Sequence, residues 1–132
     1  MKILLYIWQL PQHLLALVIL AILHLTGKLY TTRKGATHIY IRQTLFDVSF
    51  SLGNYVFLTH DYTKTILKHE LGHCLQSIIL GPLYLLIAGL PSISRNIYSR
   101  ICKKDEKWYY RSFPENWADK LGKVNRIIMK IL

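Results

Sequence analysis

A chain of 132 residues, 52% of them hydrophobic, is long enough for one domain with a modest core. Its 17 Lys and Arg against 7 Asp and Glu favour an anionic partner, and the apolar content makes a membrane surface the better match. No nucleic-acid partner is expected, because no basic run with interleaved aromatic residues suggests an RNA or DNA face and no nucleic-acid module signature is visible. The two cysteines, Cys74 and Cys102, are too far apart for a C-x-x-C motif, and we interpret both as small buried residues.

The N-terminal segment is the most apolar part of the chain. Residues 10–25 are almost continuously apolar, and together with residues 3–8 they are long enough to span a bilayer. No small-x-small cleavage site follows, which argues against a signal peptide, and apolarity on all sides argues against a buried soluble helix. We therefore expect residues 1–27 to form a membrane anchor, in which Pro11 could start the helix and Trp8 could lie at the interface.

The basic residues orient this anchor. Ahead of it lie only Lys2 and the α-amino group, and after it come Lys28, Arg33, Lys34 and Arg42. The positive-inside rule then places residues 28–132 on the cytoplasmic side of the cell membrane, with the lipid bilayer as one partner. His13 and His24 of the anchor could bind a metal, but a packed or interfacial position explains them better.

Residues 37–59 change character from helical to β-rich. H-I-Y-I-R alternates between apolar and polar residues, and two β-rich runs flank Gly53 and Asn54, a favourable pair for a hairpin turn. This pattern predicts a small antiparallel β-hairpin or sheet.

A helix should follow, from about Thr63 to Leu80, where Gly81 and Pro82 end it. Within it, K-H-E-L-G-H-C places His69 and His73 four residues apart, on one helix face, where both can bind one metal ion.

Glu70 and Gly72 stand between these histidines. Glu70 lies beside the expected metal without being aimed at it, where a general base must sit to take a proton from water. Gly72 has no helical purpose and costs about 1 kcal/mol relative to Ala, but it allows another backbone or a substrate to approach closely.

Residues 83–91, L-Y-L-L-I-A-G-L-P, form a second apolar run that is too short to span a membrane alone. Gly89 and Pro91 break it further, so we expect a core or re-entrant segment. If it did cross the membrane, the helices on either side of it would lie on opposite sides of the bilayer.

The stretch E-N-W-A-D repeats the four-residue spacing. Glu115 and Asp119 lie on one face of a last helix. A catalytic zinc ion takes three protein ligands and keeps one position open, so Glu115 can complete a site with His69 and His73. Asp119 can then accept the free N–H of a ligand histidine and fix its tautomer.

Both acids also have structural alternatives. S-F-P-E fits a capping box, with Ser112 as N-cap, Pro114 near the helix start and Glu115 bonding back to the backbone. Asp119 could pair with Lys123 one turn later. We favour the metal ligand, because Asp119 stands at the spacing that support of a ligand histidine requires.

The two motifs in this order resemble those of the gluzincin metallopeptidases, the group that includes thermolysin. The alanine in E-N-W-A-D makes the second motif similar to that of membrane-embedded CAAX-prenyl and heat-shock metallopeptidases. W-Q-L-P-Q, S-L-G-N-Y-V-F-L, G-P-L-Y-L-L-I-A-G-L-P-S and W-A-D-K-L-G also resemble segments of small bacterial membrane proteins. The gluzincin resemblance implies that His69, His73 and Glu115 are the zinc ligands. It also implies that Glu70 is the general base and that Asp119 supports a ligand histidine.

The same resemblance implies an edge strand within residues 46–59 that pairs with a peptide substrate. It also implies a Tyr or His that stabilises the transition state, for which the chain offers His60, Tyr98, Tyr109 and Tyr110.

Together these patterns predict an α+β protein with a membrane anchor, residues 1–27, and a minimal zincin-like domain, residues 28–132. In that domain the H-E-x-x-H helix would pack against the second ligand helix. The expected function is a membrane-anchored zinc metallopeptidase that cleaves a peptide or protein. The alternative is a non-catalytic zinc-binding membrane protein that acts as a structural or interaction module.

Overall fold

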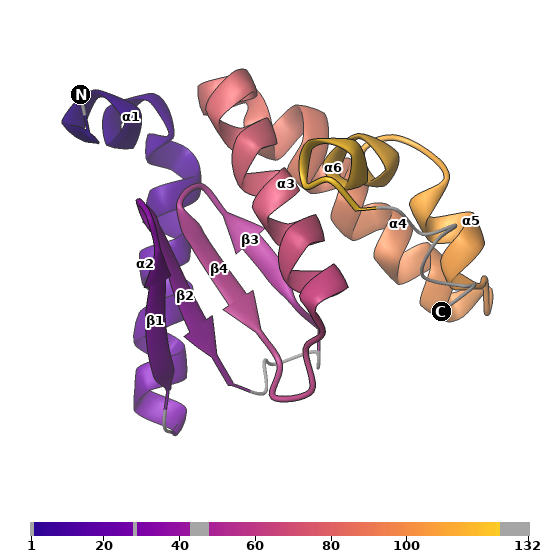
Figure 1. Cartoon of the computed structure of the whole chain (residues 1–132), viewed down its shortest axis with the longest axis horizontal. Helices are drawn as coiled ribbons and strands as arrows, with labels where there is room; N and C mark the ends of the chain where they lie inside the picture. Colours follow the sequence, from indigo (N-terminus) through magenta and orange to yellow (C-terminus); the bar gives the residue numbers. More distant parts are fainter. Residues whose placement is uncertain (1, 28, 43–47, 125–132) are drawn as a thin grey trace.

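The computed structural model describes residues 2–27, 29–42 and 48–124 and confirms the α+β class. Helix α2 covers one face of a four-stranded sheet and helix α3 covers the other (Figure 1). The elements are α1 (Lys2–Trp8), α2 (Leu10–Thr26), β1 (Tyr30–Lys34), β2 (Thr37–Ile41), β3 (Phe50–Leu52), β4 (Tyr55–Leu58), α3 (Lys64–Leu80), the 3-10 turn η1 (Gly81–Leu83), the π-helical turn η2 (Leu85–Gly89), α4 (Leu90–Ile101), α5 (Glu106–Tyr110) and α6 (Glu115–Leu121).

The sheet is mixed, which corrects the expected antiparallel arrangement. Its order is β1-β2-β4-β3, with antiparallel outer pairs and a parallel pair between β2 and β4. The predicted hairpin is present, and Gly53 adopts a φ of 62° at its turn. Strand β4 takes an inner position because Val56, Phe57 and Leu58 are all buried, so both of its faces need cover.

Two apolar cores lie on the two faces of the sheet. On one face, Ala16 and Leu23 of α2 pack with Leu52 and Phe57. On the other, Cys74 of α3 packs in a cluster with strand residues that include Val56 and Leu58. Alternate residues of β4 therefore hold the two helices on opposite sides. Of the two cysteines expected to be buried, Cys74 is buried and Cys102 is exposed.

The N-terminal segment differs from the expected anchor. Within the described residues no helix is both long and apolar enough to cross a membrane, so the membrane-crossing helix expected in residues 1–27 is not found. The segment is divided at Gln9, which leaves the helical conformation between α1 and α2.

Polar side chains explain this division. Gln12 Nε2 donates to Ser77 Oγ and to the carbonyl of Gly81, both at 2.8 Å, and Ser77 Oγ donates to Gln9 Oε1 at 2.6 Å. Trp8 Nε1 donates to the carbonyl of Ile78 at 2.8 Å. The glutamines that look misplaced in an apolar segment thus bind the last turns of α3.

Helix α3 agrees closely with the helix predicted from about Thr63 to Leu80. Thr63 caps α3 through its side chain, and the helix ends at Leu80 as expected. Residues 83–91 then run through η1 and η2 into α4. Tyr84 and Ala88 of this run are buried, whereas Leu83, Leu86 and Leu90 are exposed, so it is not a fully buried core segment.

Candidate metal centre

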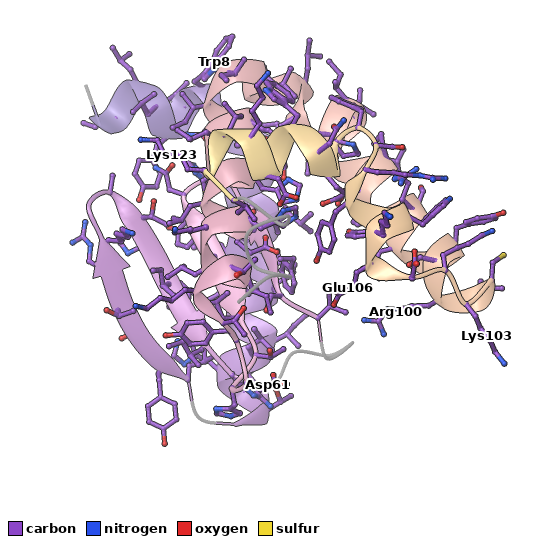
Figure 2. All side chains as sticks on the ribbon, turned by 45° about the vertical axis from the view of Figure 1, so that its right-hand side comes forward. Trp8, Asp61, Arg100, Lys103, Glu106 and Lys123 are labelled. Atoms are coloured by element: carbon purple, nitrogen blue, oxygen red, sulfur yellow. The ribbon has the colours of Figure 1, made fainter. Side chains whose placement is uncertain are left out.

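Helices α3 and α6 cross with their backbones in contact, because small residues meet at the crossing. A Cβ atom on Gly72 would lie 1.9 Å from the carbonyl oxygen of Ala118, and one on Gly122 would lie 2.0 Å from that of Lys68. Gly72 therefore admits another backbone, one of the two roles that its position in the motif left open. Figure 2 shows α6 lying across α3.

Three potential ligand atoms converge at this crossing. Glu115 Oε2 lies 2.8 Å from His69 Nε2 and 3.1 Å from His73 Nε2, and the two Nε2 atoms are 3.1 Å apart. All three residues are buried, and among the described residues they form the one cluster able to hold a metal ion. Ligand atoms about 2.1 Å from a tetrahedral zinc ion lie about 3.4 Å apart, so the three atoms need to separate by only a few tenths of an ångström.

The outward-facing ring nitrogens of both histidines are also held. Asp119 Oδ1 lies 2.6 Å from His69 Nδ1, as the spacing of E-N-W-A-D suggested. Gln76 Oε1 lies 2.7 Å from His73 Nδ1, while its Nε2 donates to the carbonyl of Pro114 at 2.9 Å. These contacts fix both rings with Nε2 turned toward Glu115.

The second oxygen of Glu115 accepts its own hydrogen bonds. Ser92 donates to Oε1 from the first turn of α4, and the Tyr109 hydroxyl donates to the same atom at 3.0 Å. The N-cap of α6 is Pro114, with no side-chain cap. The capping-box alternative for Ser112 and Glu115 is therefore wrong, since the carboxylate points into the site.

Arg95 places the tyrosine next to the site. Its guanidinium lies 4.3 Å from the ring centroid of Trp108 and donates to the carbonyls of Trp108 and Tyr109 at 3.0 and 3.2 Å. The contact ties α5 to α4. Tyr110, next along α5, stands edge-on to the His69 ring at a centroid distance of 5.0 Å.

Glu70 is buried beside the three ligand candidates. Burial raises the pKa of its carboxyl, and the neighbouring His73 and His69 oppose that shift. Its Oε2 is buried without a hydrogen-bond partner among the described residues. A buried acceptor without a protein partner is a place where a water molecule belongs.

Tyr84 is a further buried polar residue near this carboxyl. Burial raises the pKa of its hydroxyl well above the ordinary value, and the charge of Glu70 adds to the shift. The sequence gives no signal for Tyr84, because this residue stands in an apolar run and has no recognisable spacing to the motif residues.

The electrostatics of the centre favour a bound cation. Burial alone would raise the pKa of Glu115, but hydrogen bonds with His69 and His73 lower it. Burial likewise opposes protonation of His69, yet Asp119 and Glu115 raise its pKa to about 9. Three carboxyl groups, those of Glu70, Glu115 and Asp119, are thus buried around two imidazoles, an arrangement that attracts positive charge.

The other candidates from the sequence lie apart from the centre. His60 is exposed and stands against Tyr30, and Tyr98 packs on Trp108. His13 accepts a hydrogen bond from the backbone N–H of Asn54 at 3.1 Å, and His24 is exposed. Neither His13 nor His24 belongs to the metal cluster of the described residues.

The implied edge strand corresponds to β3, the outer strand next to β4, which also contacts α3. Residues 46 and 47 of the expected range lie outside the described residues.

Comparisons with known proteins add no relative. No protein-family model matches the chain, and neither the curated proteins nor the solved structures contain a match. The functional argument therefore rests on the geometry of the centre.

Proposed function

We propose that this protein is a membrane-associated zinc metallopeptidase whose metal is held by His69, His73 and Glu115. The observation that carries the proposal is the convergence of two Nε2 atoms and one carboxylate oxygen within 3.1 Å of one another. Two imidazoles and one carboxylate are a ligand set typical of catalytic zinc, which binds the imidazole of His69 once it has displaced the proton.

Zinc bound there would supply a Lewis acid that polarises a carbonyl group and acidifies water. The chain supplies the rest. Glu70 takes a proton from the attacking water, and its raised pKa brings it nearer to the range in which a base can also return a proton to a leaving amine. Asp119 and Gln76 hold the imidazoles, and Ser92 and Tyr109 hold the carboxylate of Glu115.

A peptide is the substrate that the arrangement suits best. Strand β3 is an outer strand of the sheet and contacts the helix that carries Glu70. An extended peptide can add to such an edge through its backbone, which brings one of its carbonyl groups toward the site.

A second function is favoured by the depth of the centre. His69, Glu70 and His73 are only 4%, 5% and 5% exposed, and Glu115 is 0% exposed. A closed site with little access is typical of structural zinc. The alternative is therefore a non-catalytic module in which zinc joins α3 to α6.

The deciding experiment compares zinc content and peptide cleavage in the wild type, His69→Ala and Glu70→Gln. His69→Ala should lose the metal and any cleavage. Glu70→Gln should keep stoichiometric zinc and lose cleavage, because the amide cannot take a proton. Cleavage by Glu70→Gln at the wild-type rate would refute the base assignment, and zinc without cleavage in the wild type would support the structural module.

A further inference from the structure

Helices α2 and α4 leave most of their large apolar side chains exposed. On α2, the side chains of Gln12 and His13 are buried, while Leu14, Leu17 and Val18 are exposed. The reverse is expected of a surface helix in water, where the apolar stripe faces the core. The exposed apolar residues of α2 are Leu10, Leu14, Leu15, Leu17, Val18 and Ile22, with Leu25 one turn further.

The path from η2 through α4 repeats this inversion. Its exposed apolar stripe consists of Leu86, Leu90, Ile93, Ile97 and Ile101, each more than half exposed. Successive members are three or four residues apart, so they line one face of the helix. On the inner side, Ser92 donates to Glu115, and Arg95 donates to α5. The polar face therefore serves the metal centre, and the apolar face is left outward.

The segments that carry the two apolar faces touch at η2. Leu85 of η2 packs against the core cluster that α2 forms with the sheet. Figure 1 shows α2 behind the sheet and α4 behind α6, on the same side of the molecule. At 100° per residue the exposed side chains of α2 cover roughly 160° of its circumference, a convex surface that a fluid apolar phase covers more readily than one partner helix.

The charge around these faces favours an anionic lipid surface over a second copy of the chain as the partner that covers them. Residues 2–26 and 81–101 contain no Asp or Glu, and the exposed cations Arg100, Lys103 and Lys104 stand at the end of the stripe. Figure 2 shows Arg100 and Lys103 projecting at that end of the molecule. A second copy of the chain would bring a net charge of +10 against +10, whereas anionic lipid headgroups attract each nearby cation by about 1 kcal/mol.

The packing of α2 against the sheet decides whether this helix crosses the bilayer or lies along its surface. The sheet lies against α2, and β1, at one edge, exposes Arg33 and Lys34. If α2 crossed the bilayer, the open edge of β1 would enter the hydrocarbon region, where unpaired backbone groups are not tolerated. An orientation in the plane of the interface leaves this edge in water.

We infer that the outer faces of α2 and of η2–α4 seat the protein on an anionic lipid surface without crossing it. This attachment does not depend on the metal chemistry. It places the inner side of α4, and with it Ser92 and Glu115, one helix away from the lipid.

The test is co-sedimentation of the full chain with phosphatidylcholine vesicles, with and without phosphatidylglycerol. Wild type should bind the anionic vesicles and bind neutral ones less. Ile97→Glu and Val18→Glu should each bind at least about tenfold more weakly, because a carboxylate replaces an apolar contact beside anionic headgroups. Thr32→Glu is the matched control, since Thr32 is exposed and its register partner Ile39 faces α3.

Zinc content and circular dichroism show whether each variant is folded. The inference is overturned if Ile97→Glu and Val18→Glu bind like the wild type, or if Thr32→Glu loses as much binding as they do. A lipid-free dimer that Ile97→Glu converts to a monomer would assign the face to a second copy instead. Retention of the wild type in vesicles after alkaline carbonate extraction would show that the chain does cross the bilayer.

Discussion

Glu115 uses its two carboxylate oxygens for two purposes. Oε1 accepts hydrogen bonds from Ser92 and Tyr109, and Oε2 faces His69 and His73. A carboxylate held in this way cannot turn back to cap its own helix. It is also set to offer a metal one oxygen and not both.

The first prediction separates these roles. Glu115→Gln should weaken zinc binding by at least about tenfold, because the amide lacks the charge of a ligand oxygen. Ser112→Ala should leave zinc affinity unchanged, because the N-cap residue is Pro114 and no side chain caps the helix. Competition with a chromogenic chelator measures both affinities. Equal, small effects of the two changes would contradict the ligand assignment.

The sequence could reveal part of this centre because helical spacing is a local property. His69, His73, Glu115 and Asp119 are recognisable in pairs four residues apart, and the structure brings them together. Gln76 and Ser92 were not expected at the site, and Tyr109 was expected only as a candidate for stabilising the transition state, since these roles depend on where distant elements cross. Of these residues, only Gln76 could have been found from the sequence, because it follows His73 by three residues and therefore lies on the same helix face.

At the scale of elements, the crossing of α3 and α6 depends on the absence of side chains. Gly72→Ala should place a Cβ atom against the backbone of Ala118 and force the helices apart. We expect it to lower the stability by about 2 kcal/mol or more and to weaken zinc binding, although Ala is the better helix former.

Gly89→Ala is the matched control for this prediction. A Cβ atom at Gly89 meets its nearest neighbour, Leu85 Cδ2, at 3.4 Å, which is ordinary contact. Its stability should equal or slightly exceed that of the wild type. Urea unfolding measures both variants, and an equal response of the two would mean that close approach at Gly72 is not required.

The contact between α2 and the hairpin turn should respond to pH. Burial lowers the pKa of His13, opposed by the backbone of Tyr6 and assisted by the charge of His38, and Tyr55 also faces the ring. The unfolded chain then binds a proton at a higher pH than the folded chain. The contribution of His13 to stability is complete above about pH 6.5 and is lost as the pH falls below it.

His13→Gln tests this prediction, because glutamine does not titrate and can still accept from the N–H of Asn54. Between pH 5 and pH 8, the unfolding free energy of this variant should depend less on pH than that of the wild type. The difference should correspond to at most about one proton fewer taken up on unfolding. His13→Leu removes the acceptor and should destabilise the protein across the whole range. An unchanged slope in His13→Gln would show that His13 does not titrate on unfolding.

Strand pairing shows what local patterns leave open at this scale. The hairpin around Gly53 and Asn54 was predictable from its turn residues. The parallel contact between β2 and β4 was not, because it joins strands that are separated in the chain and depends on the burial of β4 on both faces. Hydropathy alone similarly could not show that α2 buries Gln12 and His13 and exposes most of its leucines.

On the scale of the whole molecule, the described residues form two unequal parts around α3. The sheet, α2 and one side of α3 share two apolar cores. Among the residues that the structure describes, helices α4, α5 and α6 have no buried apolar cluster of their own. They meet α3 mainly through the crossing and the polar contacts of the candidate metal centre.

Removal of metal should therefore loosen one part first. Hydrogen exchange after treatment with a chelator should increase in residues 90–121 and change much less in residues 50–58. Restored zinc should restore protection, because a ligand that binds only the folded state stabilises it. Equal loss of protection in both parts would mean that the sheet also depends on the metal.

The bonds between the first helices and α3 also constrain how the chain is made. Gln12 finds its acceptors in Ser77 and Gly81, which lie 65 and 69 residues later. At typical rates of synthesis, on the order of several seconds pass between the emergence of these partners from the ribosome. During that interval the amide of Gln12 lacks the acceptors that α3 and η1 later provide, so α2 can complete its packing only after Gly81 has been synthesised.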